Sequence, residues 1–172
     1  MNGFWIVKRQ IGTKGNKMKT RKVVINKCYG GFGLSHKAVM RYAELKGIKL
    51  YPWVDGIGKK VYGDRATIGN PEIWHCINYT TVPQEEYEKM YEEEEQMPVG
   101  PGRFVKSNKV YFSYRDIPRD DATLIAVIKE LGEEANSRFA ELEIVEIPAD
   151  IDYTIEEYDG MEWIAEQHQT WG

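Results

Sequence analysis

The alternation of apolar and polar positions along the chain predicts both helices and short strands. Apolar residues recur at helical spacing after Ser35, a favourable N-cap, as far as Gly47, which would end this helix. A second helix over Ala122–Asn136 has a broad apolar face and is capped by Asp120 or Asp121. Runs rich in β-branched and aromatic residues predict strands at Lys22–Lys27, Ile48–Trp53, Lys60–Tyr62, Trp74–Thr81, Lys109–Tyr114 and Leu142–Ile147.

The C-terminal part of the chain predicts a β-hairpin. Asp159–Gly160 is a two-residue turn signal between the strand patterns Ile151–Tyr158 and Met161–Ala165, with a short helix from Met161 as the competing prediction. The order of elements favours an α+β fold with one sheet of several strands, two main helices and this hairpin. A mixed-sheet α/β fold is the alternative.

Two stretches of unusual charge define the expected domain organisation. Residues 1–17 are basic and broken by glycines, and we expect an N-terminal extension here, with an added edge strand as the alternative. Residues 18–172 are expected to form a single domain. Within it, Pro83–Gln96 predicts a very acidic helix, and the break at Pro98–Gly102 follows it. We therefore expect an acidic helical insertion near residues 83–102.

Composition places the chain among ordinary globular proteins, at 172 residues with 42% hydrophobic and 29% charged residues. No stretch has the roughly 20 apolar residues of a membrane span. The two cysteines are typical of a reducing compartment, so we expect a cytoplasmic protein.

Ten of the 23 Lys and Arg residues and none of the 27 acids lie in residues 1–43. The acidic remainder argues against binding of duplex nucleic acid, which needs a broad basic face.

The glycine-rich turn between the first strand and the first helix is the strongest candidate site. A turn at a helix N-terminus presents free N–H groups and a partial positive charge, which suit an anion. Its sequence, GGFG, has neither the P-loop nor the GxGxxG spacing. Lys27 and Lys37 would reach phosphates, and Tyr29 and Phe32 would stack on a base. A tight structural connection between strand and helix is the competing interpretation.

A second candidate stretch, Tyr114–Asp121, lies at the next strand-to-helix junction. Its arginines suit bidentate phosphate binding, and it would meet the first turn if both strands were parallel neighbours. An aromatic side chain of the C-terminal stretch, Trp163, would also stack on a base. The predicted ligand-binding residues are therefore Lys27, Tyr29, Gly30, Gly31, Phe32, Gly33, Ser35, Lys37, Arg115, Arg119, Asp120 and Trp163.

Catalytic and metal-binding arrangements have weaker signals. Cys28 and His36 bracket the first turn and would form a nucleophilic pair, but no third orienting residue can be named. His75 and Cys76 match no zinc spacing, and adjacent strand residues point to opposite faces. We therefore predict no catalytic residue, no metal site and no cofactor.

The motifs NKCYGGFGLS, IPRDD and EEYDGMEW resemble a widespread family of small, mostly uncharacterised phage and prophage proteins. The resemblance covers residues 18–51 and about 109–172, and it implies a phage origin. With the candidate anion site, it favours a counter-defence protein that sequesters a nucleotide second messenger of the host immune system without cleaving it. The alternatives are a nucleotide-processing hydrolase and a protein-binding inhibitor or accessory phage protein. The expected partner is a small nucleotide-like anion, and a homo-oligomer is a further option.

Overall fold

The computed structural model describes residues 19–56, 59–62, 77–96 and 109–167, and these contain three α-helices, two 3-10 helices and eight strands. The helices are α1 (His36–Lys46), α2 (Gln84–Glu95), α3 (Ala122–Leu131), η4 (Tyr114–Asp116) and η5 (Gly132–Ala135). The strands are β1 (Thr20–Asn26), β2 (Tyr51–Gly56), β3 (Lys59–Tyr62), β4 (Asn78–Thr80), β5 (Tyr111–Phe112), β6 (Leu142–Pro148), β7 (Tyr153–Tyr158) and β8 (Met161–Glu166). None of the described helices combines the length and the apolar character needed to cross a bilayer.

The strands form three small antiparallel sheets, with the orders β1-β6, β3-β2-β4-β5 and β7-β8. The predicted α+β class is confirmed, whereas the predicted single sheet and its mixed-sheet alternative are wrong. The physical reason lies at the outer edge of β1. The N–H of Val24 donates to the carbonyl of Arg119, and the N–H of Asn26 donates to the Glu162 carboxylate. These contacts close the edge to a further strand.

Local signals set the ends of the helices. Ser35 accepts a hydrogen bond from the N–H of Ala38 at 3.1 Å, and Gly47 ends α1 in the left-handed region at φ 68°. Both predicted caps of α1 are confirmed. The helix α3 begins after Asp121 as predicted but ends at Leu131, earlier than Asn136, because Gly132 has φ 57° and the chain continues as η5.

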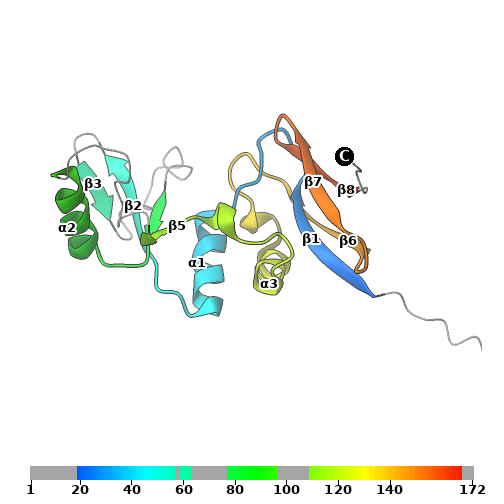
Figure 1. Cartoon of the computed structure of the whole chain (residues 1–172), viewed down its shortest axis with the longest axis horizontal. Helices are drawn as coiled ribbons and strands as arrows, with labels where there is room; N and C mark the ends of the chain where they lie inside the picture. The colour runs from blue at the N-terminus through cyan, green and yellow to red at the C-terminus, as the bar shows by residue number, and fades with distance from the viewer. Residues whose placement is uncertain (1–18, 57–58, 63–76, 97–108, 168–172) are drawn as a thin grey trace, which may run out of the picture.

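The ribbon β1-β6 is a layer between the helices α1 and α3 and the hairpin β7-β8 (Figure 1). Val24 faces the core shared with α1 and α3, while Val23 and Ile25 pack against the hairpin. All three side chains are at most 2% exposed, because alternate residues of a strand point to opposite faces and both faces are covered here. In the hairpin, Asp159 and Gly160 both have positive φ, so the predicted two-residue turn is confirmed.

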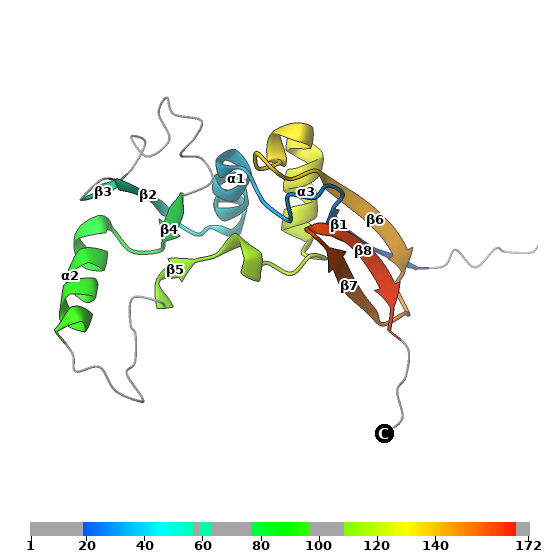
Figure 2. The ribbon, with the colours of Figure 1, turned by 90° about the horizontal axis from the view of Figure 1, so that it is seen from above.

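The sheet β3-β2-β4-β5 and α2 lie at the other end of the molecule (Figure 2). Helix α2 matches the predicted acidic helix, and its Tyr87 ring packs 5.7 Å from the ring of Trp53. Glu85, Glu86, Glu92 and Glu93 are exposed and form a solvated face of this helix. The predicted extension at residues 1–17 and the predicted break at Pro98–Gly102 lie outside the described residues.

An ion pair between the half-buried Arg119 and the buried Glu162 connects the segment before α3 with β1 and β8. The guanidinium of Arg119 donates to both carboxylate oxygens of Glu162, at 2.9 and 3.1 Å, and the N–H of Asn26 donates to the same carboxylate at 2.8 Å. The guanidinium carbon also lies 3.3 Å from the ring centroid of Phe32. Three motifs that are far apart in the sequence, NKCYGGFGLS, IPRDD and EEYDGMEW, thus meet at one point.

Removing one member of this pair should strongly destabilise the fold. We expect Glu162→Ala to lower the free energy of unfolding by about 3–5 kcal/mol, because it leaves the half-buried Arg119 charge without its partner. The exposed pair Lys37–Glu134 supplies the control, and Glu134→Ala should cost less than about 1 kcal/mol. Urea unfolding measures both changes, and a Glu162→Ala loss as small as that of the control would contradict the role assigned to the pair.

The N-cap of α3 makes stability pH-dependent. Burial alone would raise the pKa of Asp121, but hydrogen bonds from Lys46 and from the N–H groups of Leu124 and Thr123 hold this pKa below its usual range. Because the unfolded value is about 4, the carboxylate stabilises the fold fully above that pH, and this contribution is lost as the pH falls through the lower native pKa. We expect Asp121→Ala to reduce the free energy of unfolding by about 1–2 kcal/mol at pH 7, and by less at pH 3.

The neighbouring Asp120, which is exposed, supplies the control for this cap. Asp120→Ala should change the free energy of unfolding by no more than about 0.5 kcal/mol at either pH. Urea unfolding at both pH values gives the comparison. An Asp121→Ala penalty that is equal at pH 3 and pH 7 would contradict the assignment.

Candidate functional site

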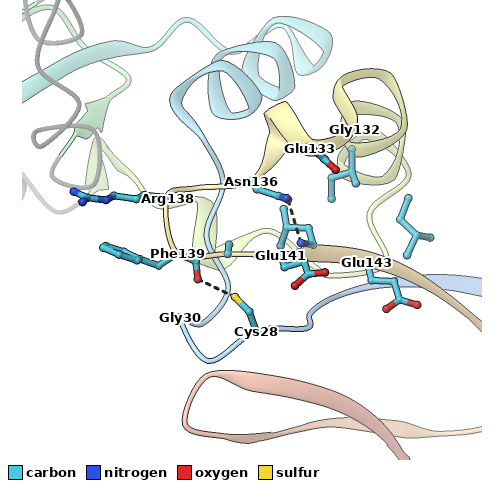
Figure 3. Close-up of a pocket in the computed structure, with 13 residues that line it drawn as sticks. Cys28, Gly30, Gly132, Glu133, Asn136, Arg138, Phe139, Glu141 and Glu143 are labelled. Atoms are coloured by element: carbon cyan, nitrogen blue, oxygen red, sulfur yellow. Dashed lines mark hydrogen bonds between the residues drawn. The ribbon is translucent and has the colours of Figure 1, made fainter.

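A pocket of about 890 Å³ lies beside the glycine-rich turn (Figure 3). One wall comes from Cys28 and Gly30 in the turn after β1, and another from the end of α3 and from η5. The segment that leads into β6 and the first three residues of that strand complete it. The volume is in the range typical of small-molecule sites.

Close packing explains why this turn is rich in glycine. A Cβ on Gly30 would overlap the carbonyl oxygen of Phe139, and one on Gly33 would overlap the hydroxyl of Ser137. Gly31 has φ 81°, a conformation that L side chains rarely adopt. The structural interpretation of the turn is therefore supported for these three residues, while their predicted role in ligand binding stays a prediction.

Cys28 and His36 have separate partners and do not pair with each other. The Cys28 thiol donates to the carbonyl of Phe139 at 3.0 Å. The Nδ1 atom of His36 lies 2.9 Å from the Tyr79 hydroxyl, and burial raises the pKa of that tyrosine. His75 and Cys76, the other residues considered as metal ligands, lie outside the described residues.

Several side chains predicted to bind ligand make internal contacts instead. Arg119 is held by Glu162 and covers Phe32, which is 5% exposed. Lys37 forms an ion pair with Glu134, and the Ser35 hydroxyl donates to the carbonyl of Glu134 at 2.6 Å while it caps α1. These partners, Glu162 and Glu134, lie far away in the sequence, so no local sequence pattern predicts the contacts.

The other predicted residues divide between the pocket and the rest of the surface. Arg115 and Asp120 are exposed and do not line the pocket, and neither does Trp163, which donates to Glu156. Gly30 lines the pocket, and the N–H of Lys27 bonds to the carbonyl of Glu141, a lining residue. Tyr29 lies between them in the sequence and is 64% exposed.

The sequence interpretation missed the opposite wall of the pocket. Arg138 and Phe139 lie in the short connection before β6, and the guanidinium of Arg138 is 5.1 Å from the Phe139 ring centroid. Phe139 is 55% exposed, so a large aromatic residue in a polar connection was the one available signal. The acidic residues Glu133, Glu141 and Glu143 also line the pocket.

Figure 3 shows how these charges are separated. Arg138 and Phe139 extend on one flank, and Glu141 and Glu143 lie on the other. The pocket therefore has an aromatic and cationic end and an acidic end. Comparison with known proteins adds nothing to this description, because no protein-family model, no curated protein and no solved structure matches the chain.

The close contact between the turn and the pocket wall predicts the effect of a single methyl group. We expect Gly30→Ala to lower the free energy of unfolding by about 3 kcal/mol, because the added Cβ overlaps the Phe139 backbone and the turn has to shift. Gly47→Ala, where a Cβ meets open space and the backbone is left-handed at φ 68° and ψ 23°, should cost only about 1 kcal/mol. Thermal or urea unfolding ranks the two variants, and the reverse order would contradict the assigned packing.

Proposed function

We propose that the chain is a counter-defence binding protein that sequesters a nucleotide second messenger of the host and does not cleave it. One observation carries the proposal: Arg138 and the exposed ring of Phe139 lie side by side in the lining of the pocket. Lys27 and the exposed Tyr29 belong to the turn that supplies Cys28 and Gly30 to the same lining. Aromatic rings beside cations suit a ligand that combines a base with a phosphate.

The aromatic residues supply a place for a base. Tyr29 and Phe139 lie on the two segments that meet where Gly30 contacts the Phe139 backbone. Both side chains are more than half exposed, although large aromatic side chains are usually covered by the fold. Stacking of a base on one such ring contributes about 1–3 kcal/mol.

The cations at the mouth differ from those that the fold uses internally. In the part of the chain that the structure describes, neither Lys27 nor Arg138 forms an ion pair, whereas Lys37 and Arg119 each do. Arg138 therefore offers a guanidinium that suits bidentate contact with a phosphate. Lys27 adds a second positive charge near the same turn.

The acidic end limits the kind of nucleotide. Glu133, Glu141 and Glu143 outnumber the single lining cation, so a phosphate belongs at the Arg138 end. Carboxylates accept hydrogen bonds from ribose hydroxyls and from base amino groups. The arrangement favours a ligand with few phosphates and many donors, such as a cyclic or an ADP-ribose-type nucleotide.

A nucleotide panel with recovery of the ligand tests the proposal. At a ligand concentration 100 times its Kd, binding stabilises the fold by about 2.7 kcal/mol, so the Tm should rise by about 5–10 °C. The panel contains cyclic mononucleotides, cyclic dinucleotides and ADP-ribose derivatives. Mass spectrometry after heat release should return the ligand intact. A cleaved product would establish the hydrolase alternative, and no shift with any nucleotide would refute the proposal.

A variant at the mouth of the pocket makes the test specific. We expect Arg138→Ala to weaken nucleotide binding about 10–100-fold, because a hydrogen bond to a charged group contributes about 1.5–3 kcal/mol. Lys89→Ala, on the exposed face of α2, removes one positive charge far from the pocket and should leave the affinity unchanged. Titration calorimetry measures both, and equal effects of the two variants would show that only net charge matters.

A further inference from the structure

One face of the hairpin β7-β8 is turned away from the rest of the fold. The opposite face carries Ile155 and Ile164, which pack against the ribbon β1-β6. Because alternate residues of a strand point to opposite faces, Glu156, Tyr158 and Trp163 lie on the outward face. Tyr158 is 73% exposed and Trp163 is 41% exposed. Two large aromatic rings are thus offered to a partner, and such rings are enriched at protein interfaces.

Trp163 and Glu156 place a ring and a carboxylate side by side on this face. The two residues are register partners across the hairpin, and the indole N–H of Trp163 donates to the Glu156 carboxylate at 3.1 Å. Within the described residues, no cation lies over the Trp163 ring and no ion pair involves Glu156. The second acceptor oxygen and the face of the ring are therefore available to a donor from outside.

Arg119 shows which side chain such a combination holds in this fold. Its guanidinium carbon lies 3.3 Å from the ring centroid of Phe32, and its N–H groups donate to both carboxylate oxygens of Glu162. A flat guanidinium can stack on a ring and donate to a carboxylate at the same time, whereas a lysine ammonium is a compact point charge. Trp163 follows Glu162 in β8 and, with Glu156, repeats the combination on the opposite face.

The charge of this part of the chain indicates the kind of partner. Residues 139–172 contain ten Asp and Glu residues and neither Lys nor Arg. A second copy docked face to face would bring like charges together with no Lys or Arg from this part of either chain, which is costly at an interface. A basic segment would instead be attracted to the hairpin. Charge complementarity thus favours a basic partner over self-association.

We propose that the outward face of the hairpin binds an arginine-rich segment of a partner protein. One arginine stacks on the Trp163 ring and donates to Glu156, and the exposed Tyr158 ring receives a second on the same face. No residue of β7 or β8 is among the residues that line the pocket. This surface is therefore independent of the proposed nucleotide binding.

A peptide of alternating glycine and arginine, and a lysine counterpart of equal length and charge, test the proposal. We expect the full chain to bind the arginine peptide about 3–5-fold more tightly, because stacking and the carboxylate contact are made together. Trp163→Ala should weaken binding of the arginine peptide about 3–5-fold and bring the ratio of the two affinities close to one. Fluorescence anisotropy of labelled peptides at physiological salt measures these affinities.

Three further variants make the comparison specific. Glu156→Gln keeps an oxygen that accepts from the indole N–H but removes the charge, and it should weaken binding about 2–5-fold. Tyr158→Ala, at a more exposed position than Trp163, should also weaken binding and leaves the test intact if Trp163→Ala does not fold. Glu92→Gln on the exposed face of α2, at the other end of the molecule (Figure 2), removes the same charge and should change neither affinity.

Equal affinities of the wild-type chain for the two peptides would overturn the proposal, as would losses in the Trp163 and Glu156 variants no larger than that of Glu92→Gln. A dimer that Trp163→Ala dissociates in sedimentation experiments would assign the face to a second copy. A gain in peptide affinity when residues 1–17 are deleted would assign it to the basic N-terminal segment of the chain. Either result would overturn the proposed partner, and neither depends on the outcome of the nucleotide panel.

Discussion

The ion pair between Arg119 and Glu162 is the interaction on which the rest of the structure depends. A two-stranded ribbon such as β1-β6 is marginally stable unless its faces and edges are covered. Arg119 covers the outer edge of β1 with its own carbonyl and guanidinium, and Glu162 holds both that guanidinium and the N–H of Asn26. The pair thus fixes α3 and the hairpin against the same strand, and a buried charge without its partner would be costly.

The position of the pocket follows from this arrangement. Asn26, the last residue of β1, donates to the carbonyls of Cys28 and Gly160 at 2.5 and 2.7 Å and accepts from the N–H of Glu141. It therefore connects the glycine-rich turn, the tip of the hairpin and the start of β6. The close approach of Gly160 to the backbone of the turn adds a second contact at the same place. The side chain of Asn26 therefore hydrogen-bonds to both walls of the pocket, at Cys28 in the turn and at Glu141 before β6.

Features determined by a few neighbouring residues could be predicted from the sequence. The cap at Ser35 and the turn at Asp159–Gly160 depend on short-range chemistry and were predicted correctly. Asp121, the N-cap of α3, is one of the two aspartates predicted for that role. The pairing of β1 with β6 was not predicted, because contacts between residues more than a hundred positions apart decide it. The same limit applies to Arg119, whose sequence surroundings suit a phosphate ligand equally well until Glu162 is known to lie beside it.

The distribution of charge connects the fold with the proposed ligand. Arg119 and Arg41 have carboxylate partners, whereas Arg138 lies beside the exposed Phe139 ring and forms no ion pair within the described residues. The glutamates near β6 also differ in their surroundings, because Glu141 and Glu143 line the pocket whereas Glu146 faces Lys22 across the strand pair. An uncovered strand edge is a liability that proteins usually close. On the outer edge of β6 the Asn136 side chain accepts from the N–H of Leu142, and Pro148 has no N–H. The register places the backbone groups of Ile144 and Glu146 on this edge between them, and Ile144 lines the pocket, so a ligand in the pocket would meet the edge at Ile144.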